Sequence, residues 1–178
     1  DDQPIAKKLL DGLLLISASE FSSKMTQQLA EMATRAREAD EVLAFYAERE
    51  IAKADGDVLP FFPGTERGRA AGQGVQPVLV SLQRQDVGSE GILAALISKF
   101  RNANSDVVAS HPGPDDLRAK CVRKIVIVTD FIGSGKRVYE MLEAFAKVAT
   151  IQSWRSYGLI TFEVVCYSAA EWGAKIVA

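Results

Sequence analysis

The residues with the clearest chemical potential lie in the segment 129–137, which reads Thr-Asp-Phe-Ile-Gly-Ser-Gly-Lys-Arg. Gly133 and Gly135 permit a tight backbone turn in which amide groups point inward toward an anion. Ser134 adds a hydroxyl donor. The segment opens directly into a helical pattern, and a helix N-terminus carries a partial positive charge. These residue types at this spacing predict a phosphate-binding loop.

Three charged residues accompany this loop. Lys136 and Arg137 supply full positive charges at the start of the helix, where side chains equally often point to solvent. Asp130 follows the apolar run 125–128, so it is placed to accept hydrogen bonds from sugar hydroxyls or to hold Mg²⁺ through water. The segment therefore predicts a site for a phosphorylated sugar or a nucleotide.

The spacing disfavours one common type of phosphate loop. A P-loop requires a Gly five residues before the Gly of Gly-Lys, and a Ser or Thr directly after the lysine. Asp130 and Arg137 occupy those two positions. A P-loop NTPase is therefore a poor match for this chain.

Apolar runs that alternate with helical patterns position this loop. Their β-branched composition is typical of strands buried on both faces of a parallel sheet, joined by right-handed crossovers. Ligands bind such sheets beyond the carboxyl ends of the strands, which is where residue 129 lies. The predicted strands are 78–82, 125–128 and 160–167, and helices are predicted over 92–100, over 138–148 and from about residue 170.

The first third of the chain is predicted to be helical. Apolar residues recur at helical spacing, Ser19 or Ser22 is expected to cap the second helix, and Asp40 a third that buries Val42, Leu43 and Tyr46. The chain is accordingly divided into a helical extension, 1–54, and an α/β domain, 55–178. We expect the extension to pack on the core or on a partner protein.

Two further segments precede the strand predicted at 78–82. Residues 58–62 are expected to form a short edge strand, because Pro60 would remove a hydrogen-bond donor from a central one. Residues 63–76 contain four glycines and are expected to form a mobile loop. Arg67 and Arg69 in this loop could reach an anion, although a solvated loop without a ligand is the commoner arrangement.

The segment 125–137 resembles the signature of the type I phosphoribosyltransferases. That signature is a buried strand, two acidic residues, two apolar residues and a Ser/Thr/Gly-rich loop that opens a helix. Here Asp130 matches the second acid, 131–132 the apolar pair and 133–137 the loop. The sequence Asp-Phe-Ile-Gly-Ser-Gly at 130–135 is most similar to a divergent branch of this superfamily that is found in bacterial anti-phage systems, including retron-associated effectors. The resemblance covers about residues 75–178 and implies a parallel-sheet, Rossmann-like domain and a role in anti-phage defence.

The resemblance also implies a ligand and further site residues. In these transferases an earlier loop holds pyrophosphate, and residues 83–91 match its place, with Arg84 supplying charge and Gly88 and Ser89 supplying amides. The implied ligand is PRPP or a related nucleotide, with Mg²⁺ as the cofactor. Asp130 and Arg84 are the implied catalytic residues, of which Asp130 orients the ribose and holds the metal. Residues 102–119 are the implied lid.

Two departures from the signature leave other functions open. Thr129 stands where the first acid is expected, and Lys136 and Arg137 stand where small or hydroxylated residues are usual. The first alternative is a catalytically inactive module of the same fold that binds a nucleotide or a partner. The second is a structural protein whose N-terminal helices mediate assembly, for example with a reverse transcriptase or its nucleic acid.

The composition excludes several classes of protein. The 178 residues carry 21 Lys and Arg against 23 Asp and Glu, a formal net charge of -2, so a broad nucleic-acid surface is not expected and any such contact would be indirect. No apolar run is long enough to span a bilayer, and no secretory signal is visible. Two isolated cysteines and one histidine disfavour a structural zinc site and indicate a cytoplasmic location.

A few remaining residues carry weaker expectations. His111 lies in a Ser-His-Pro-Gly turn and is expected to be exposed to solvent. Cys121 is expected to be packed and Cys166 to lie in the core. The chain begins without methionine and ends abruptly, so we expect a fragment or a processed form.

Overall fold

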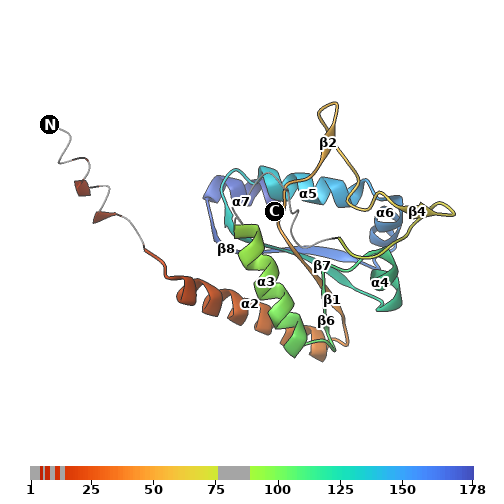
Figure 1. Ribbon diagram of the computed structural model, residues 1–178, viewed down its shortest axis with the longest axis horizontal. Coiled ribbons are helices and arrows are strands. Elements are labelled where there is room, and N and C mark those ends of the chain that lie inside the picture. Colours follow the sequence, from red (N-terminus) through yellow and green to blue (C-terminus); the bar gives the residue numbers. More distant parts are fainter. Residues whose placement is uncertain (1–4, 6, 9–10, 13–14, 76–88) are drawn as a thin grey trace.

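The computed structural model describes residues 5, 7, 8, 11, 12, 15–75 and 89–178. Its main sheet has four parallel strands in the order β6–β1–β7–β8, with helices on both faces (Figure 1). The predicted α/β class with a parallel sheet is confirmed, and the arrangement is consistent with a Rossmann-like fold. The strands are β1 (Leu43–Ala47), β6 (Val108–Ser110), β7 (Lys124–Ile132) and β8 (Thr161–Ala169).

Two apolar cores lie on opposite faces of this sheet. Alternate side chains of β7 enter the two cores, since Ile125 and Ile127 face one and Val126 and Val128 the other. Helices α2 and α3 cover the second face, and the remaining helices cover the first. The helices are α2 (Ala18–Glu38), α3 (Ser89–Ala103), α4 (Pro114–Ala119), α5 (Lys136–Ala146), α6 (Ala149–Ser156) and α7 (Glu171–Val177).

The strand order creates a topological switch point between β1 and β7. The chain leaves β1, passes through α3 and returns as β6 on one side of β1, whereas β7 and β8 lie on the other side. Helices that connect strands in opposite directions cover opposite faces and leave a crevice between the strand ends. The crevice lies at the carboxyl ends of β1 and β7, where the predicted phosphate loop begins.

The helix predicted after Asp40 is wrong, because residues 43–47 form β1. All five side chains of this strand are buried, and the strand pairs with β6 on one edge and with β7 on the other. A short, continuously apolar run fits a buried strand and a helix face equally well, and the non-local pairing decides here. The sheet thus takes a central strand from before residue 54. The cap of α2 is Ser17 rather than Ser19 or Ser22.

Two short hairpins follow β1, in the region where an edge strand and a mobile loop were predicted. In the first, Asp55 and Gly56 join β2 (Lys53–Ala54) to β3 (Asp57–Val58); in the second, Arg67 and Gly68 join β4 (Thr65–Glu66) to β5 (Arg69–Ala70). All four turn residues have positive φ, as two-residue hairpin turns of type I′ require. The predicted edge strand at 58–62 is therefore confined to Val58. The predicted strand 78–82 lies outside the described residues.

The lid expected over residues 102–119 is also wrong. These residues complete α3, form β6 and begin the return to β7 through α4. Val107, Val108 and Ala109 are buried, so this part belongs to the core. The apolar run is too short to stand out in the sequence, and pairing with β1 makes it a strand.

His111 completes the pairing of β6 with β1, and its predicted exposure is wrong. It is 4% exposed, and its Nε2 accepts a hydrogen bond of 3.0 Å from the backbone N–H of Ala47. The neutral ring then carries its proton on Nδ1, which lies 3.0 Å from Ser110 Oγ. The imidazole thus satisfies a strand donor just beyond the end of β6. Burial lowers the pKa of His111 to about 4, and the positive charge of Arg49 adds to this shift.

This buried imidazole makes the stability of the fold depend on pH. The folded-state pKa of His111 lies below its unfolded value of 6.5, so the unfolded chain takes up the proton first as the pH falls. We expect the free energy of unfolding to decrease by up to roughly 3 kcal/mol between pH 6.5 and pH 4 on account of this residue. Urea unfolding across this range measures the effect.

His111→Asn is the matched variant for that measurement, because asparagine tolerates the positive φ of this position and does not titrate. We expect it to be less stable than the wild type at pH 7 and to lose less stability on acidification. An equal pH dependence in both proteins would contradict the assigned burial and hydrogen bond of His111.

Candidate functional site

The predicted phosphate loop connects β7 to α5 at the switch point. Residues 133–135 lie between the last residue of the strand and the first residue of the helix. Gly135 is the N-cap, with a left-handed φ of 72°, and Ser134 Oγ accepts a hydrogen bond of 3.3 Å from the Lys136 N–H. The other N–H groups of the first helical turn have no partner within the helix. This strand–loop–helix geometry is the one that binds anions.

Helix α7 packs closely against this loop. A Cβ added to Gly135 would lie 2.8 Å from the carbonyl oxygen of Gly173, and a Cβ on Gly173 would collide with the carbonyl of Gly133. Gly133 differs, because a Cβ there would meet the ring of Phe131 at 3.3 Å and no backbone atom within 4 Å among the described residues. Gly135 and Gly173 are therefore required by packing, whereas Gly133 has room on one side.

The two residues before the loop's apolar pair have different environments. Asp130 is half-buried, and its Oδ1 accepts a hydrogen bond of 2.8 Å from the N–H of Phe131. Thr129 is fully buried, and its hydroxyl donates a hydrogen bond of 2.5 Å to Glu48 Oε2. The Asp130 carboxylate can therefore still contact a ligand at the crevice. The Thr129 hydroxyl is already hydrogen-bonded to Glu48, the residue that follows β1.

Glu48 is the residue of this site that the sequence analysis missed. It directly follows β1, its N–H donates to the Val128 carbonyl at 2.8 Å, and it is 6% exposed. Its Oε1 has no hydrogen-bond partner among the described residues. Burial raises the pKa of Glu48, against the lowering effects of the Thr129 hydrogen bond and the charge of Arg137. The sequence contained a signal for this residue, because Glu48 is an acid directly after the apolar run 43–47. It was missed because this run was predicted to be a helix rather than a strand.

The two cations of the loop point to different surroundings. Arg137 Nη1 lies 3.4 Å from Glu90 Oε1 and 3.8 Å from Glu48 Oε1, so the guanidinium extends from α5 across the crevice. Lys136 Nζ lies 3.8 Å from Glu140 Oε1, and its side chain is 72% exposed. The Arg137 side chain is itself 56% exposed, and ion pairs of this kind contribute at most about 1 kcal/mol. An anionic ligand can therefore recruit Arg137 at little cost.

A cavity of about 220 Å³ lies between these groups. Its volume is below the roughly 300–1,000 Å³ of sites that enclose a drug-sized ligand, so the cavity has room for a small group such as a phosphate rather than for a whole nucleotide. The cavity is lined by Glu48 and by residues 130–138.

The residues expected to hold pyrophosphate are described only in part. Arg84 and Gly88 lie outside the described residues. Ser89 is the first residue of α3, and the next residue, Glu90, contacts Arg137. The start of α3 therefore borders the site through Glu90.

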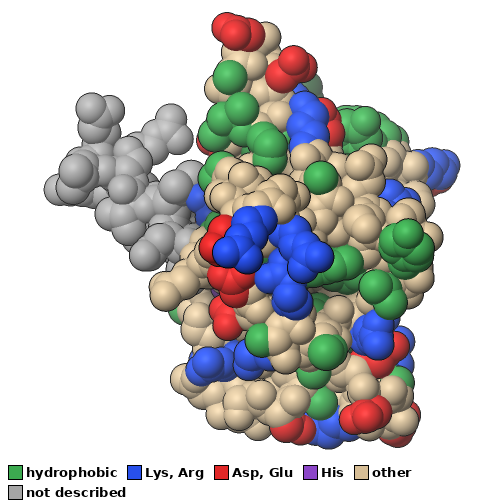
Figure 2. Space-filling model, turned by 90° about the vertical axis from the view of Figure 1, so that its right-hand side faces the viewer, with side chains coloured by type: hydrophobic (Ala, Val, Ile, Leu, Met, Phe, Trp, Pro, Cys, Tyr) green, Lys and Arg blue, Asp and Glu red, His purple; other side chains and the backbone are tan. Residues whose placement is uncertain are grey.

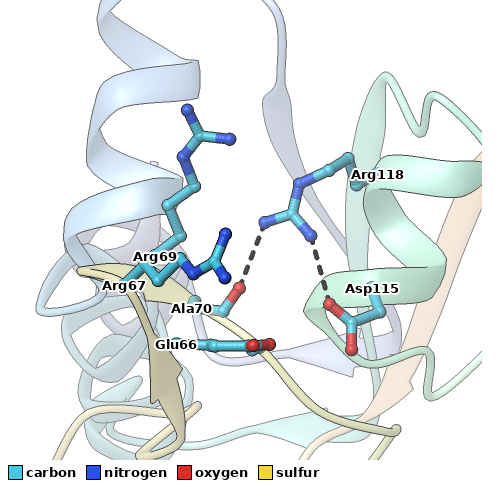
Figure 3. A pocket seen from close by; sticks show the side chains of 7 residues that line it. Glu66, Arg67, Arg69, Ala70, Asp115 and Arg118 are labelled. Atoms are coloured by element: carbon cyan, nitrogen blue, oxygen red, sulfur yellow. Dashed lines mark hydrogen bonds and ion pairs between the residues drawn. The ribbon is translucent and has the colours of Figure 1, made fainter.

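The arginines of the glycine-rich segment line a separate hollow of about 460 Å³ (Figure 3). Arg67 and Arg69 from the second hairpin face Arg118 from α4, which donates hydrogen bonds of 3.1 Å to Asp115 and to the carbonyl of Ala70. Glu66 also lines this hollow, and Figure 2 shows acidic side chains beside the basic ones on this face. Glu66 and Asp115 partly compensate the positive charge of the three arginines in this hollow.

The two cysteines show different degrees of exposure. Cys121 is exposed, so its predicted packing is wrong. It lies two residues after the end of the short helix α4 and has a left-handed conformation. It is thus in a turn rather than in the buried strand β7 that comes after it. Cys166 is half-buried in β8. Among the described residues, no group of three or more His, Cys, Asp or Glu side chains is arranged to hold a metal ion.

Comparison with known protein families, with curated proteins and with solved structures gives no match. None of the described helices is long and apolar enough to cross a membrane. The functional assignment therefore depends on the geometry of the crevice and on the motif at its edge.

The unequal surroundings of the loop glycines predict unequal tolerance. We expect Gly135→Ala to lower the free energy of unfolding by about 1–2 kcal/mol, because of the left-handed φ and the close approach of Gly173. Gly133→Ala should change it by less than about 0.5 kcal/mol. Urea unfolding of the two variants tests this, and equal losses would contradict the described packing of α7.

Proposed function

We propose that this chain binds a phosphoribosyl ligand, PRPP or a related nucleotide, as a phosphoribosyltransferase-like protein. The observation that carries the proposal is the glycine loop between β7 and α5 at the switch point of a parallel sheet. Amides of the first helical turn and the Ser134 hydroxyl would bind the 5-phosphate, and Arg137 would add a charge-assisted contact. A role in anti-phage defence rests on the sequence resemblance alone and stays a prediction.

The arrangement also supplies parts of a transfer reaction. In such a transfer, the bond between the anomeric carbon and pyrophosphate breaks and a bond to an acceptor forms. Binding of the remote 5-phosphate fixes the position of the reacting carbon, and Asp130 would orient the ribose hydroxyls. Arg84, Gly88 and Ser89 remain the proposed contacts of the departing pyrophosphate.

The carboxylates of the crevice fit Mg²⁺ as the accompanying cation. Mg²⁺ is usually held by one or two carboxylates together with phosphate oxygens and water, and Asp130 and the unpaired oxygen of Glu48 line the same cavity. When bound, Mg²⁺ would offset the negative charge that develops on the leaving pyrophosphate.

One observation favours the alternative of a binding module without catalysis. Thr129 replaces the first acid of the motif, and its buried hydroxyl is already engaged by Glu48. Residue 129 therefore contributes no carboxylate to a ribose or a metal. Both functions require ligand binding at the loop, and only the transferase releases pyrophosphate when an acceptor is present.

Calorimetric titration with PRPP and Mg²⁺ tests the proposal, with ribose 5-phosphate and ATP as comparison ligands. We expect PRPP to bind at least about tenfold more tightly than either. Gly133→Val should abolish binding without unfolding the chain, because its side chain enters the open side of the loop. Asp130→Asn should weaken PRPP more than ribose 5-phosphate.

Asp116→Asn is the matched control, because it makes the same change on the exposed surface of α4 and should leave PRPP binding unchanged. Weak and equal binding of all three ligands would reduce the loop to a generic anion site. Binding that survives Gly133→Val would place the ligand elsewhere and overturn the proposal.

A further inference from the structure

The carboxylate of Glu48 has one buried oxygen that accepts no hydrogen bond from the described residues. Oε1 is the one buried side-chain oxygen or nitrogen in the described part of the chain without a hydrogen-bond partner. A buried polar atom without a partner typically costs about 1–3 kcal/mol, and more when it is charged. Because this oxygen makes no hydrogen bond that would offset the cost of its burial, we consider a ligand as its partner.

The sheet holds this carboxylate firmly in place. The N–H of Glu48 extends the pairing of β1 with β7, and the imidazole of His111 holds the preceding residue, Ala47. Thr129 binds Oε2, and Glu48 and Asp130 line the same cavity. The carboxylate is therefore held in place through Oε2, while Oε1 accepts no hydrogen bond from the described residues.

Arg137 does not account for this oxygen. Its Nη1 lies 3.8 Å from Oε1, beyond hydrogen-bond distance, and lies closer to Glu90. More than half of the Arg137 side chain is exposed. Water therefore screens this pair, and Arg137 remains free to turn toward an anion.

Asp130 lies close enough to share a ligand with Glu48. Thr129 Oγ1 is 2.5 Å from Glu48 Oε2 and 3.5 Å from Asp130 Oδ1, so the two carboxylates lie within about 6 Å of each other, the sum of those distances. Mg²⁺ binds oxygen ligands at about 2.1 Å in an octahedron and retains waters. Two carboxylates no more than about 6 Å apart can hold one such ion, one of them directly and the other through a bound water.

We propose that Glu48 and Asp130 form a two-carboxylate site for Mg²⁺, in which Glu48 supplies the carboxylate that residue 129 lacks. Thr129 is then a positioning residue, because its hydroxyl fixes the carboxylate that the neighbouring strand brings in. This inference rests on the proposed function for the phosphate oxygens that complete the coordination of the ion. The contribution of the two carboxylates is measurable without any phosphate ligand.

Electron paramagnetic resonance with Mn²⁺ in place of Mg²⁺ tests the site directly. The signal of free Mn²⁺ falls as the ion binds, and this readout does not depend on catalysis. We expect Glu48→Gln and Asp130→Asn each to weaken Mn²⁺ binding at least about tenfold, and Thr129→Val to weaken it by a similar factor. Thr129→Ser, which keeps the hydroxyl, should restore most of the affinity.

Glu90→Gln is the matched control, because it removes the same charge from the other carboxylate beside Arg137. We expect it to change Mn²⁺ affinity by less than about threefold, because Glu90 does not line the cavity and its side chain is partly exposed to screening water. The inference is overturned if Glu48→Gln leaves the affinity unchanged, if Glu90→Gln lowers it as much, or if the wild type binds no Mn²⁺. Thermal unfolding establishes that each variant is folded, and Thr129→Val replaces Glu48→Gln if the latter is not.

Titration with ribose 5-phosphate in EDTA separates this inference from the proposed function. If neither PRPP nor ribose 5-phosphate binds to the wild type and Mn²⁺ still binds through Glu48, the proposed function fails and the cation site stands. If ribose 5-phosphate binds equally to the wild type and to Glu48→Gln, while Mn²⁺ affinity is the same in both, the phosphate loop stands and the cation site is wrong.

Discussion

The parallel register between β1 and β7 is the constraint on which the rest of the site depends. It pairs Ala47 with Val128, so the next residue of each strand, Glu48 and Thr129, must lie side by side. The hydrogen bond between their side chains follows from this register, as does the place of the glycine loop beside Glu48. A slip by one residue would turn each side chain to the opposite face of the sheet and separate the two residues. Backbone pairing thus assembles a polar site from segments that are far apart in the sequence.

Local patterns of the sequence predicted the half of the site that is contiguous. The loop at 133–135 and the helix after it follow from glycine, serine and an apolar periodicity, which act over a few residues. The strand at 43–47 could not be predicted in this way, because its helical spacing and its apolar character were equally consistent with a helix until a partner strand was present. Glu48 and His111 were missed for the same reason, since both derive their roles from β1. Sequence reasoning had the residue types that it needed, but it had no information on which strands pair with each other.

The charges of the crevice are balanced so that a ligand can rearrange them. Arg137 is shared between Glu48 and Glu90 at distances that leave every pair weak, and its exposure keeps water nearby. A phosphate would draw the guanidinium away from both glutamates, and a cation would compensate the carboxylate left behind. Binding of an anion and of a cation should therefore support each other, because each neutralises the charge that the other exposes. Such coupling is a property of the free site and requires no movement of the backbone.

The contact between Gly173 and the loop has a consequence for how this protein tolerates mutation. Any side chain at position 173 would press on the carbonyl of Gly133 and deform the glycine loop, although Gly173 belongs to α7 and does not line the cavity beside the loop. A random screen for loss of binding should therefore return position 173 together with positions 133–135. Variation at the two places should be coupled during divergence, since a larger residue in the helix is tolerable only after the loop has moved away.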